Sequence, residues 1–195
     1  MEIYLIRHTT PKIEKEVCYG QSDIPLAESF RIEADKLLKT LPKKIEVVYS
    51  SPSIRCYQLA EIIKPKLLII DKRLLEMNFG DWEMKKWDDI NQIALDVWMK
   101  NFIDVRTPNG ENFVDLNNRV NNFIDEVSKQ NYKKIAVVTH AGVIRCMVAK
   151  VFKMTPNDVF KIHFDFASVT KIVFNSDNSY LKQGNFADSS SSGKI

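Results

Sequence analysis

Glycine, histidine and cysteine are scarce in this chain of 195 residues, which contains six, three and three of them. The cysteines are odd in number, widely spaced and in no C-x-x-C pair, so we expect neither a disulfide framework nor a zinc ribbon. The glycines are scattered, which excludes the G-x-x-x-x-G-K phosphate loop and the G-x-G-x-x-G dinucleotide turn. Any bound phosphate must therefore be held largely by side chains. The histidines form no H-E-x-x-H and no i,i+4 pair, and we expect no metal and no cofactor.

Charge is nearly balanced, with 28 Lys and Arg against 25 Asp and Glu and a net charge of +3. The lysines occur as scattered pairs and no arginine-rich run is present, so nucleic acid is not an expected partner. No stretch approaches the ~18 apolar residues of a membrane span, and the four apolar residues before Arg7 are too few for a signal peptide. We expect a soluble, cytoplasmic protein that binds neither nucleic acid nor membrane. The sequence does not indicate its oligomeric state.

Length and composition favour a single folded unit. Domains usually run to ~100–200 residues, and a chain of this size buries roughly 70% of its unfolded surface. We expect one domain over residues 1–185, with a small helical insertion near 84–106, in which Trp87 and Trp98 serve as packing residues. The serine-rich stretch over 186–195 is expected to be a polar, flexible tail.

Short apolar runs alternate with helical patterns along the chain. Continuous β-prone runs predict strands that are buried on both faces, at 3–6, 45–49, 67–70 and 135–139. A further strand is expected at 168–175, paired near 180–181. Apolar stripes at helical spacing predict helices, at 30–41 and 113–127, and Ser51-Pro52 predicts the cap and first residue of another that runs to Ile63. This alternation predicts an α/β fold, a three-layer αβα sandwich around a mostly parallel sheet.

Polar side chains follow the predicted strands at the edge where open α/β sheets bind their ligands. Arg7 and His8 follow the strand at 3–6, and Arg55 lies one turn into the helix after the strand at 45–49. Glu76 comes after the strand at 67–70, and His140 directly follows the strand at 135–139. Taken singly, a strand-end arginine is usually a solvated charge and a lone histidine usually a satisfied hydrogen-bonding group. Two of the three histidines, however, occupy equivalent positions, which favours a shared site.

Such a cluster suits the chemistry of phosphate esters. Arginines bind phosphate oxygens through two parallel hydrogen bonds. A neutral imidazole can attack phosphorus if one ring nitrogen is free and the other is fixed by a hydrogen bond. A helix that begins after His140 would add backbone N–H groups directed at an anion. Glu76 could protonate a leaving oxygen if its surroundings raise its pKa.

Four segments, in this order, carry motifs that occur together in one known family. They read R-H-T-T-P from Arg7, S-S-P-S-I-R from Ser50, L-E followed by F-G-D-W-E from Leu75, and V-V-T-H-A-G-V-I-R from Val137. Over roughly residues 2–175 the chain thereby resembles the histidine phosphatase (phosphoglycerate mutase-like) superfamily, which implies a phosphoglycerate mutase-like fold. Thr9 and Ala141 stand where the family most often has glycine, but both are small enough to leave a phosphate pocket intact.

The resemblance implies a role for each residue of the cluster. His8 would be the nucleophile that becomes transiently phosphorylated, and Glu76 the general acid that later activates water. The phosphoryl group would be held by Arg7, Arg55, His140 and Gln21. His163 has no counterpart in these motifs and is expected to be structural, and the cysteines are expected to be small buried hydrophobes.

The substrate is narrowed by the segment C-Y-G-Q-S-D-I-P-L from Cys18, which together with T-T-P from Thr9 looks most like the α-ribazole phosphatase branch. That likeness implies a small phosphorylated metabolite as partner, α-ribazole 5′-phosphate, dephosphorylated in the assembly of the cobalamin nucleotide loop. A broad-specificity phosphatase stays open, because the same segment occurs there. A mutase is disfavoured, since G-E-T-x-x-N does not follow the nucleophile and the short insertion offers only Lys100 and Arg106 as basic residues.

Three further alternatives remain at this point. A metal-assisted hydrolase would use Asp23, Asp71 or Asp88, although their spacing does not support a site. A non-catalytic phosphate-binding or scaffold protein would have no need of the complete set of reactive residues. A phosphatase that acts on protein phosphohistidine also stays open.

Overall fold

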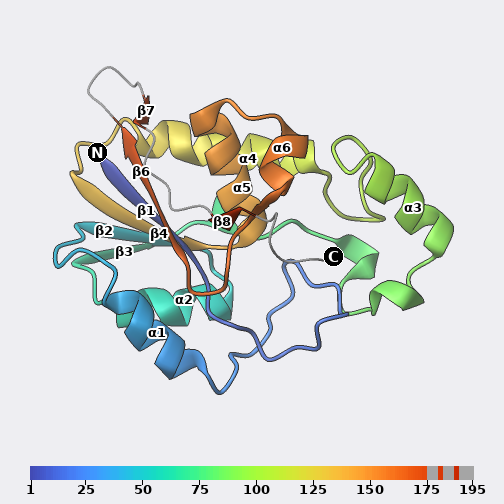
Figure 1. The fold of residues 1–195 in the computed structure, drawn as a ribbon, viewed down its shortest axis with the longest axis horizontal. Coiled ribbons are helices and arrows are strands. Elements are labelled where there is room, and N and C mark those ends of the chain that lie inside the picture. The colour runs from blue at the N-terminus through green and yellow to red at the C-terminus, as the bar shows by residue number, and fades with distance from the viewer. Residues whose placement is uncertain (175–179, 182–186, 189–195) are drawn as a thin grey trace.

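A central sheet organises the chain, for which the computed structural model describes residues 1–174, 180–181 and 187–188 (Figure 1). Its strands, in the spatial order β3-β2-β4-β1-β6-β7, are β3 (Leu67–Ile70), β2 (Val47–Ser50), β4 (Lys134–Thr139), β1 (Glu2–Arg7), β6 (Val169–Phe174) and β7 (Tyr180–Leu181). The four strands from β3 to β1 are parallel, whereas β6 and β7 are antiparallel to their neighbours. A separate pair joins β5 (Ile162–His163) to β8 (Ala187–Asp188).

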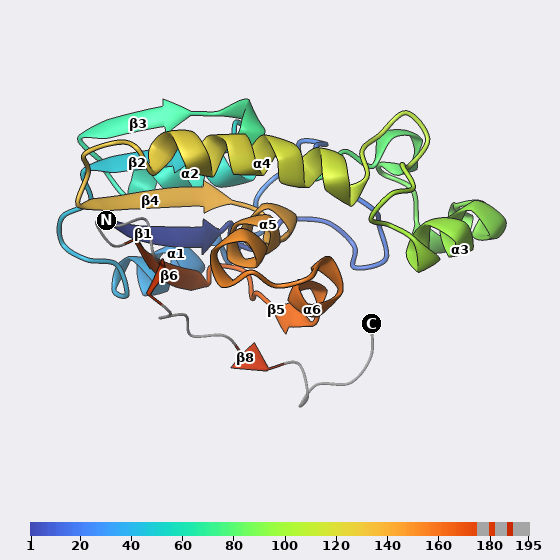
Figure 2. The same cartoon turned by 90° about the horizontal axis from the view of Figure 1, so that it is seen from above.

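Helices cover both faces of the sheet (Figure 2). One face carries α1 (Phe30–Leu38) and α2 (Ile54–Ile62); the other carries α4 (Phe113–Val127) and α5 (Ala141–Phe152). Successive side chains of a strand point to opposite faces, so Ile3 and Leu5 pack under α4 and α5 while Tyr4 and Ile6 pack against α1 and α2. Both sides of β1 are thus buried, and the predicted three-layer αβα sandwich is confirmed.

The predicted strands and helices form close to their expected positions, but the expected burial of 67–70 on both faces is wrong, because β3 is the edge strand and leaves Leu67 and Ile70 exposed. The run at 45–49 forms a strand over Val47–Ser50, the helix expected over 30–41 ends at Leu38, and the pairing near 180–181 is found between β6 and β7. The long helix α4 begins at a capping box, in which Asn112 and Asp115 each accept a hydrogen bond from the other's backbone N–H.

One predicted helix start is wrong. The helix expected to begin at Pro52, capped by Ser51, begins at Ile54 after Ser53. Ser51 directly follows β2, and its N–H still donates to the carbonyl of Val138. Its hydroxyl lies 3.0 Å from a ring nitrogen of His140 and accepts from the N–H of Ser53 at 3.4 Å, one residue before the helix begins.

The region expected to hold an insertion, 84–106, contains α3 (Gln92–Lys100) and a short 3₁₀ turn, Trp87–Asp89 (Figure 1). Two further 3₁₀ turns, Lys72–Leu74 and Gly80–Trp82, follow β3, and α6 (Pro156–Phe160) follows α5. Residues 189–195 of the expected tail lie outside the described residues. No helix in the described ranges is both long and apolar enough to cross a bilayer.

Candidate active site

The carboxyl ends of β1 and β4 bring two of the predicted residues together. Arg7 pairs in register with Thr139, so His8 and His140 leave adjacent strands side by side, with ring centroids 5.1 Å apart. Beside them lies a cavity of about 230 Å³, lined by Arg7, His8, Tyr19, Glu76, Met77, Phe79, Trp98, Phe102, Leu116, His140, Gly142, Arg145 and Phe160. Four of the six predicted site residues therefore meet in one cavity, as the positions of the strand ends led us to expect.

The imidazole of His8 is buried, 2% exposed, and fixed by its neighbour. Its Nδ1 lies 2.7 Å from the carbonyl oxygen of Thr9. A carbonyl only accepts hydrogen bonds, so this contact places the proton on Nδ1 and leaves a lone pair on Nε2. One ring nitrogen is thus fixed and the other free, which is the arrangement that a nucleophilic imidazole needs.

His140 is held from both sides. Arg55 Nη2 lies 3.3 Å from its Nδ1, and because a guanidinium only donates, Nδ1 is the acceptor and Nε2 carries the proton toward Ser51. Cys56 Sγ lies 3.5 Å from that same Nε2. Arg55 is itself fully buried and also donates to the carbonyls of Gly20 and Ser22. It supports His140 from behind and does not line the cavity.

Burial keeps both histidines neutral. It lowers the pKa of His8 to about 3, assisted by the positive charge of Arg55. The pKa of His140 is lowered for the same first reason, with His8 and Arg55 contributing further. A neutral His8 is the reactive form, so the folded protein holds it ready for attack at any ordinary pH.

These lowered pKa values predict a loss of stability in mild acid. A histidine in the unfolded chain has a pKa near 6.5. Below that pH the two histidines are therefore protonated in the unfolded chain but stay neutral in the folded chain. The stabilisation is complete above about pH 6.5 and is lost as the pH falls toward 3. Between pH 7.5 and 5.5 we expect His8 to lower the free energy of unfolding by about 1.4 kcal/mol, and His140 to add a loss in the same direction. Urea titrations at the two pH values measure this loss.

A matched pair of variants isolates the contribution of His8. His8→Asn should lose less stability than the wild type between the two pH values, by about 1.4 kcal/mol. His163→Asn is the control, because the imidazole of His163 is largely exposed and faces Asp165. Equal pH dependence in the wild type and His8→Asn would contradict a neutral, buried His8.

The carboxylate of Glu76 meets the first turn of α5. Its Oε2 accepts from the N–H of Gly142 at 3.1 Å and its Oε1 from the N–H of Met77 at 2.9 Å. A Cβ at position 142 would lie 2.2 Å from Oε1, so only glycine allows this close approach. The helix N-terminus that we expected to face a bound anion thus donates to Glu76 in this structure.

Two of the predicted phosphate-binding residues, Arg55 and Gln21, lie outside the cavity lining. The side-chain amide of Gln21 donates to the carbonyl of Glu76 at 3.0 Å, and its backbone N–H donates to Glu83. Contact of Gln21 with phosphate stays a prediction. What the structure shows is that Gln21 supports the segment that carries Glu76.

The sequence analysis missed Arg145 and the aromatic wall of the cavity. Arg145 lies one turn after Gly142 on α5, stacks over Phe160 with its guanidinium carbon 5.1 Å from the ring centroid, and lines the cavity. Trp98, expected to be only a packing residue, packs against Trp82 and also lines the cavity. The available signals were the helical spacing from Gly142 to Arg145 and the aromatic content of the insertion.

Other predicted residues lie away from the cavity. Lys100 pairs with Asp96, and Arg106 pairs with Asp115, both at the surface. The three cysteines are free and buried in separate apolar clusters, as expected.

Two of the three carboxylates considered for a metal site have other partners. Asp23 accepts from the N–H of Ile54, and Asp71 forms an ion pair with Arg73. Across the described part of the chain, no three His, Cys, Asp or Glu side chains come together as metal ligands would.

Known proteins resemble this chain in sequence and in fold. A family model described as the histidine phosphatase superfamily (branch 1) matches residues 3–186. The putative phosphoserine phosphatase 2 of Hydrogenobacter thermophilus is 30% identical over 187 residues, which cover 92% of each chain. The adenosylcobalamin/alpha-ribazole phosphatase of Escherichia coli K12 is 28% identical over 179 residues, covering 85% of this chain and 86% of the other. The solved alpha-ribazole phosphatase of Shigella flexneri superposes with a TM-score of 0.87 at 27% identity, covering 95% of this chain and 96% of that one.

Proposed function

The chain belongs to the histidine phosphatase superfamily, and on that premise we propose that it is a metal-independent phosphomonoesterase that works through a phosphohistidine at His8. One observation carries the proposal. The fixed Nδ1 of His8 leaves Nε2 as a free lone pair beside a cavity that also contains a carboxyl group, Glu76, and an arginine, Arg7.

The reaction follows from these atoms in two steps. Nε2 of His8 forms a bond to phosphorus as the bond from phosphorus to the ester oxygen breaks, and the carboxyl group of Glu76 gives its proton to the departing oxygen. In the second step a water molecule attacks phosphorus, the Glu76 carboxylate takes a proton from it, and the bond between phosphorus and Nε2 breaks. Inorganic phosphate leaves, and neutral His8 and protonated Glu76 are restored.

We assign the phosphate oxygens to Arg7 and His140, which line the cavity, and keep Arg55 and Gln21 as phosphate contacts that require their side chains to leave their present partners. Support for Arg7 comes from its unsatisfied polar atom: its Nε is buried and has no hydrogen-bond partner among the described residues. Its Nη1 donates to the carbonyl of Phe164 and its guanidinium carbon lies 3.8 Å from the ring centroid of Phe166, so the side chain is oriented before any substrate arrives. A preoriented guanidinium suits the charge that spreads over the phosphoryl oxygens in the transition state.

The substrate we favour is α-ribazole 5′-phosphate, which would place the protein in the assembly of the cobalamin nucleotide loop. The likeness to the alpha-ribazole phosphatases of E. coli and S. flexneri supports this choice. So does the cavity wall, where Phe79, Trp98 and Phe102 offer aromatic surface to a flat, apolar base.

Phosphoserine is the second candidate, and one observation favours it. Arg145 provides a cationic group on the cavity wall that could bind a substrate carboxylate, and the relative from H. thermophilus is named as a putative phosphoserine phosphatase. A mutase gains no support, because Lys100 and Arg106 are paired elsewhere and supply no second cationic subsite.

A substrate panel tests the proposal. We expect kcat/KM for α-ribazole 5′-phosphate to exceed that for L-phosphoserine and 3-phosphoglycerate by about tenfold or more, because each ~1.4 kcal/mol of aromatic contact in the transition state is worth a factor of ten. His8→Ala provides the blank, and EDTA should leave every rate unchanged. A preference for L-phosphoserine would replace the favoured substrate with the second candidate. Strong inhibition by EDTA would contradict the metal-independent mechanism.

A further inference from the structure

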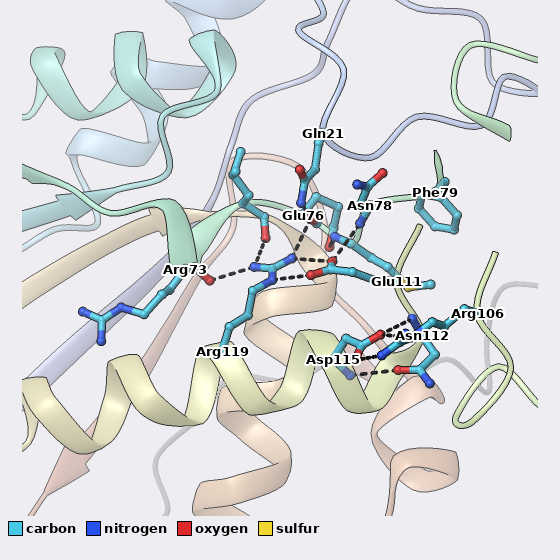
Figure 3. A network of polar contacts seen from close by, with 12 residues as sticks. Gln21, Arg73, Glu76, Asn78, Phe79, Arg106, Glu111, Asn112, Asp115 and Arg119 are labelled. Carbon is cyan, nitrogen blue, oxygen red and sulfur yellow. Dashed lines mark hydrogen bonds and ion pairs between the residues drawn. The ribbon is translucent and has the colours of Figure 1, made fainter. Parts of the chain in front are cut away.

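Arg119, on the inner side of α4, donates hydrogen bonds to the backbone of the segment that carries Glu76 (Figure 3). We propose that Arg119, locked by Glu111, is a positioning residue that holds the Glu76 carboxyl group where it transfers the proton. This inference rests on the proposed function, since it concerns the acid of that reaction. Arg119 does not line the cavity, so it would act through Glu76 and not on the substrate.

The guanidinium of Arg119 donates to three backbone carbonyls within the four residues 73–76. Its Nη1 donates to the carbonyls of Arg73 at 2.8 Å and Leu75 at 2.6 Å, and its Nη2 donates to the carbonyl of Glu76 at 2.8 Å. Gln21 donates to that same carbonyl of Glu76 from the other side. Arg73 lies in the 3₁₀ turn Lys72–Leu74, and Leu75 and Glu76 follow it outside any helix or strand. None of the three carbonyls has a partner in a strand or α-helix ladder, so side chains satisfy them.

Glu111 fixes the guanidinium of Arg119, and we call these two side chains together the clamp. Its carboxylate binds Nε and Nη2 of Arg119 at 2.8 and 2.9 Å, in the bidentate arrangement that fixes a guanidinium plane. The same carboxylate accepts from the N–H of Asn78 at 2.9 Å, and the N–H of Glu111 donates to the carbonyl of Asn78 at 2.8 Å. Hydrogen bonds therefore hold the segment on both sides of Met77. Before Met77 they use the carbonyls of Arg73, Leu75 and Glu76, and after it they use the N–H and the carbonyl of Asn78.

The clamp fixes the backbone of Glu76 while the carboxylate points the other way, to Gly142 at the start of α5. Glu76 therefore accepts hydrogen bonds from two helices. Arg119 of α4 donates to its backbone carbonyl, and the N–H of Gly142 in α5 donates to its carboxylate. An error of ~1 Å in the position of a catalytic group can cost ~10²-fold in rate, so the hold on the carbonyl has a direct catalytic consequence.

Lysine could not replace this arginine. An ammonium group is a point charge without the planar fork, and it could not satisfy three carbonyls and both carboxylate oxygens of Glu111 in their present directions. The side chains of Arg119 and Glu111 are only 18% and 20% exposed, so solvent cannot readily replace the lost hydrogen bonds.

The test compares two classes of leaving group in Arg119→Met and Arg119→Lys. With the best alkyl phosphate of the substrate panel, whose leaving oxygen needs a proton, we expect kcat to fall by roughly 30-fold, a part of the ~10²–10⁴-fold that general acid catalysis supplies. With 4-nitrophenyl phosphate, whose leaving group needs no proton, we expect the rate of His8 phosphorylation, measured as pre-steady-state release of 4-nitrophenolate, to fall by about threefold or less. Arg106→Met is the matched control, since Arg106 pairs with Asp115 on the same helix and contacts no part of the Glu76 segment.

A double-mutant cycle with Glu76→Gln decides whether Arg119 acts through Glu76. If it does, adding Arg119→Met to Glu76→Gln should lower the rate on the alkyl phosphate by no more than about twofold, because the acid is already absent. A full 30-fold further loss in the double variant would overturn the proposal. So would equal losses in the rate of His8 phosphorylation by the alkyl and the aryl phosphate in the single variant. Arg119→Lys carries the same comparison should Arg119→Met fail to purify as a folded protein.

Failure of this inference is distinguishable from failure of the proposed function. A wild-type protein without His8-dependent activity on any phosphomonoester overturns both. An active wild type whose Arg119 variants lose activity uniformly overturns only the role of Arg119, and leaves the phosphohistidine mechanism standing.

Discussion

His8→Ala is expected to lower kcat/KM for every phosphomonoester by roughly 10⁴-fold or more, because the variant lacks the only atom that could form the covalent intermediate. The loss should be the same for alkyl and aryl phosphates, since both must pass through the phosphohistidine. Steady-state rates with 4-nitrophenyl phosphate measure this loss in kcat/KM over the widest range of rates. The variant should also remain folded, because an alanine at the end of β1 leaves the strand's pairing with β4 intact.

His163→Ala is the control for His8→Ala, since its imidazole is exposed on β5 and takes no part in the cavity. We expect it to keep wild-type rates. A His8→Ala protein that retained a hundredth or more of the wild-type rate would show that another group carries the attack, and the assignment of His8 would be withdrawn.

Glu76→Gln is expected to have the second-largest effect, and a selective one. An amide cannot give a proton to an alkoxide, so kcat for an alkyl phosphate should fall by roughly 10²–10⁴-fold. The rate of His8 phosphorylation by 4-nitrophenyl phosphate should fall by about threefold or less, because that leaving group departs without a proton. Pre-steady-state release of 4-nitrophenolate measures this first step separately from the hydrolysis of the intermediate.

Glu126→Gln provides a matched control, because Glu126 pairs with Arg73 at the surface, far along α4 from the cavity. It should leave both rates at their wild-type values. If Glu76→Gln slowed the alkyl and aryl reactions to the same extent, Glu76 would be a structural or phosphate-binding residue and not the acid.

Local patterns were sufficient to predict the sheet and part of the site. The run from Ile3 to Ile6 alternates between two buried faces, so its continuous apolar character identified a central strand. Because parallel strands end at the same edge, the positions of His8 and His140 directly after two such strands predicted their proximity. These inferences needed only sequence distance and the direction of the strands.

Features that depend on contacts between distant segments escaped the sequence analysis. Arg119 reads as one more polar residue on an amphipathic helix, and only the folded chain shows that it faces the backbone of residues 73–76. Ser51 looks like a helix cap until the sheet brings His140 to its hydroxyl. Trp98 is part of the cavity because α3 packs its indole against Phe79 and Trp82, a contact between separate segments that no local pattern encodes.

The most direct measurement is a rapid quench into alkaline detergent, in which phosphohistidine is stable, with substrate labelled at phosphorus. We predict a burst of protein-bound label that lies on His8 and reaches at most one equivalent per chain. The label should form at least as fast as phosphate is released in the steady state. The bound label should be absent from His8→Ala and should accumulate in Glu76→Gln, where hydrolysis of the intermediate is slowed. Turnover by the wild type without label on any histidine would contradict the phosphohistidine mechanism. Bound label on the His8→Ala protein would contradict it as well.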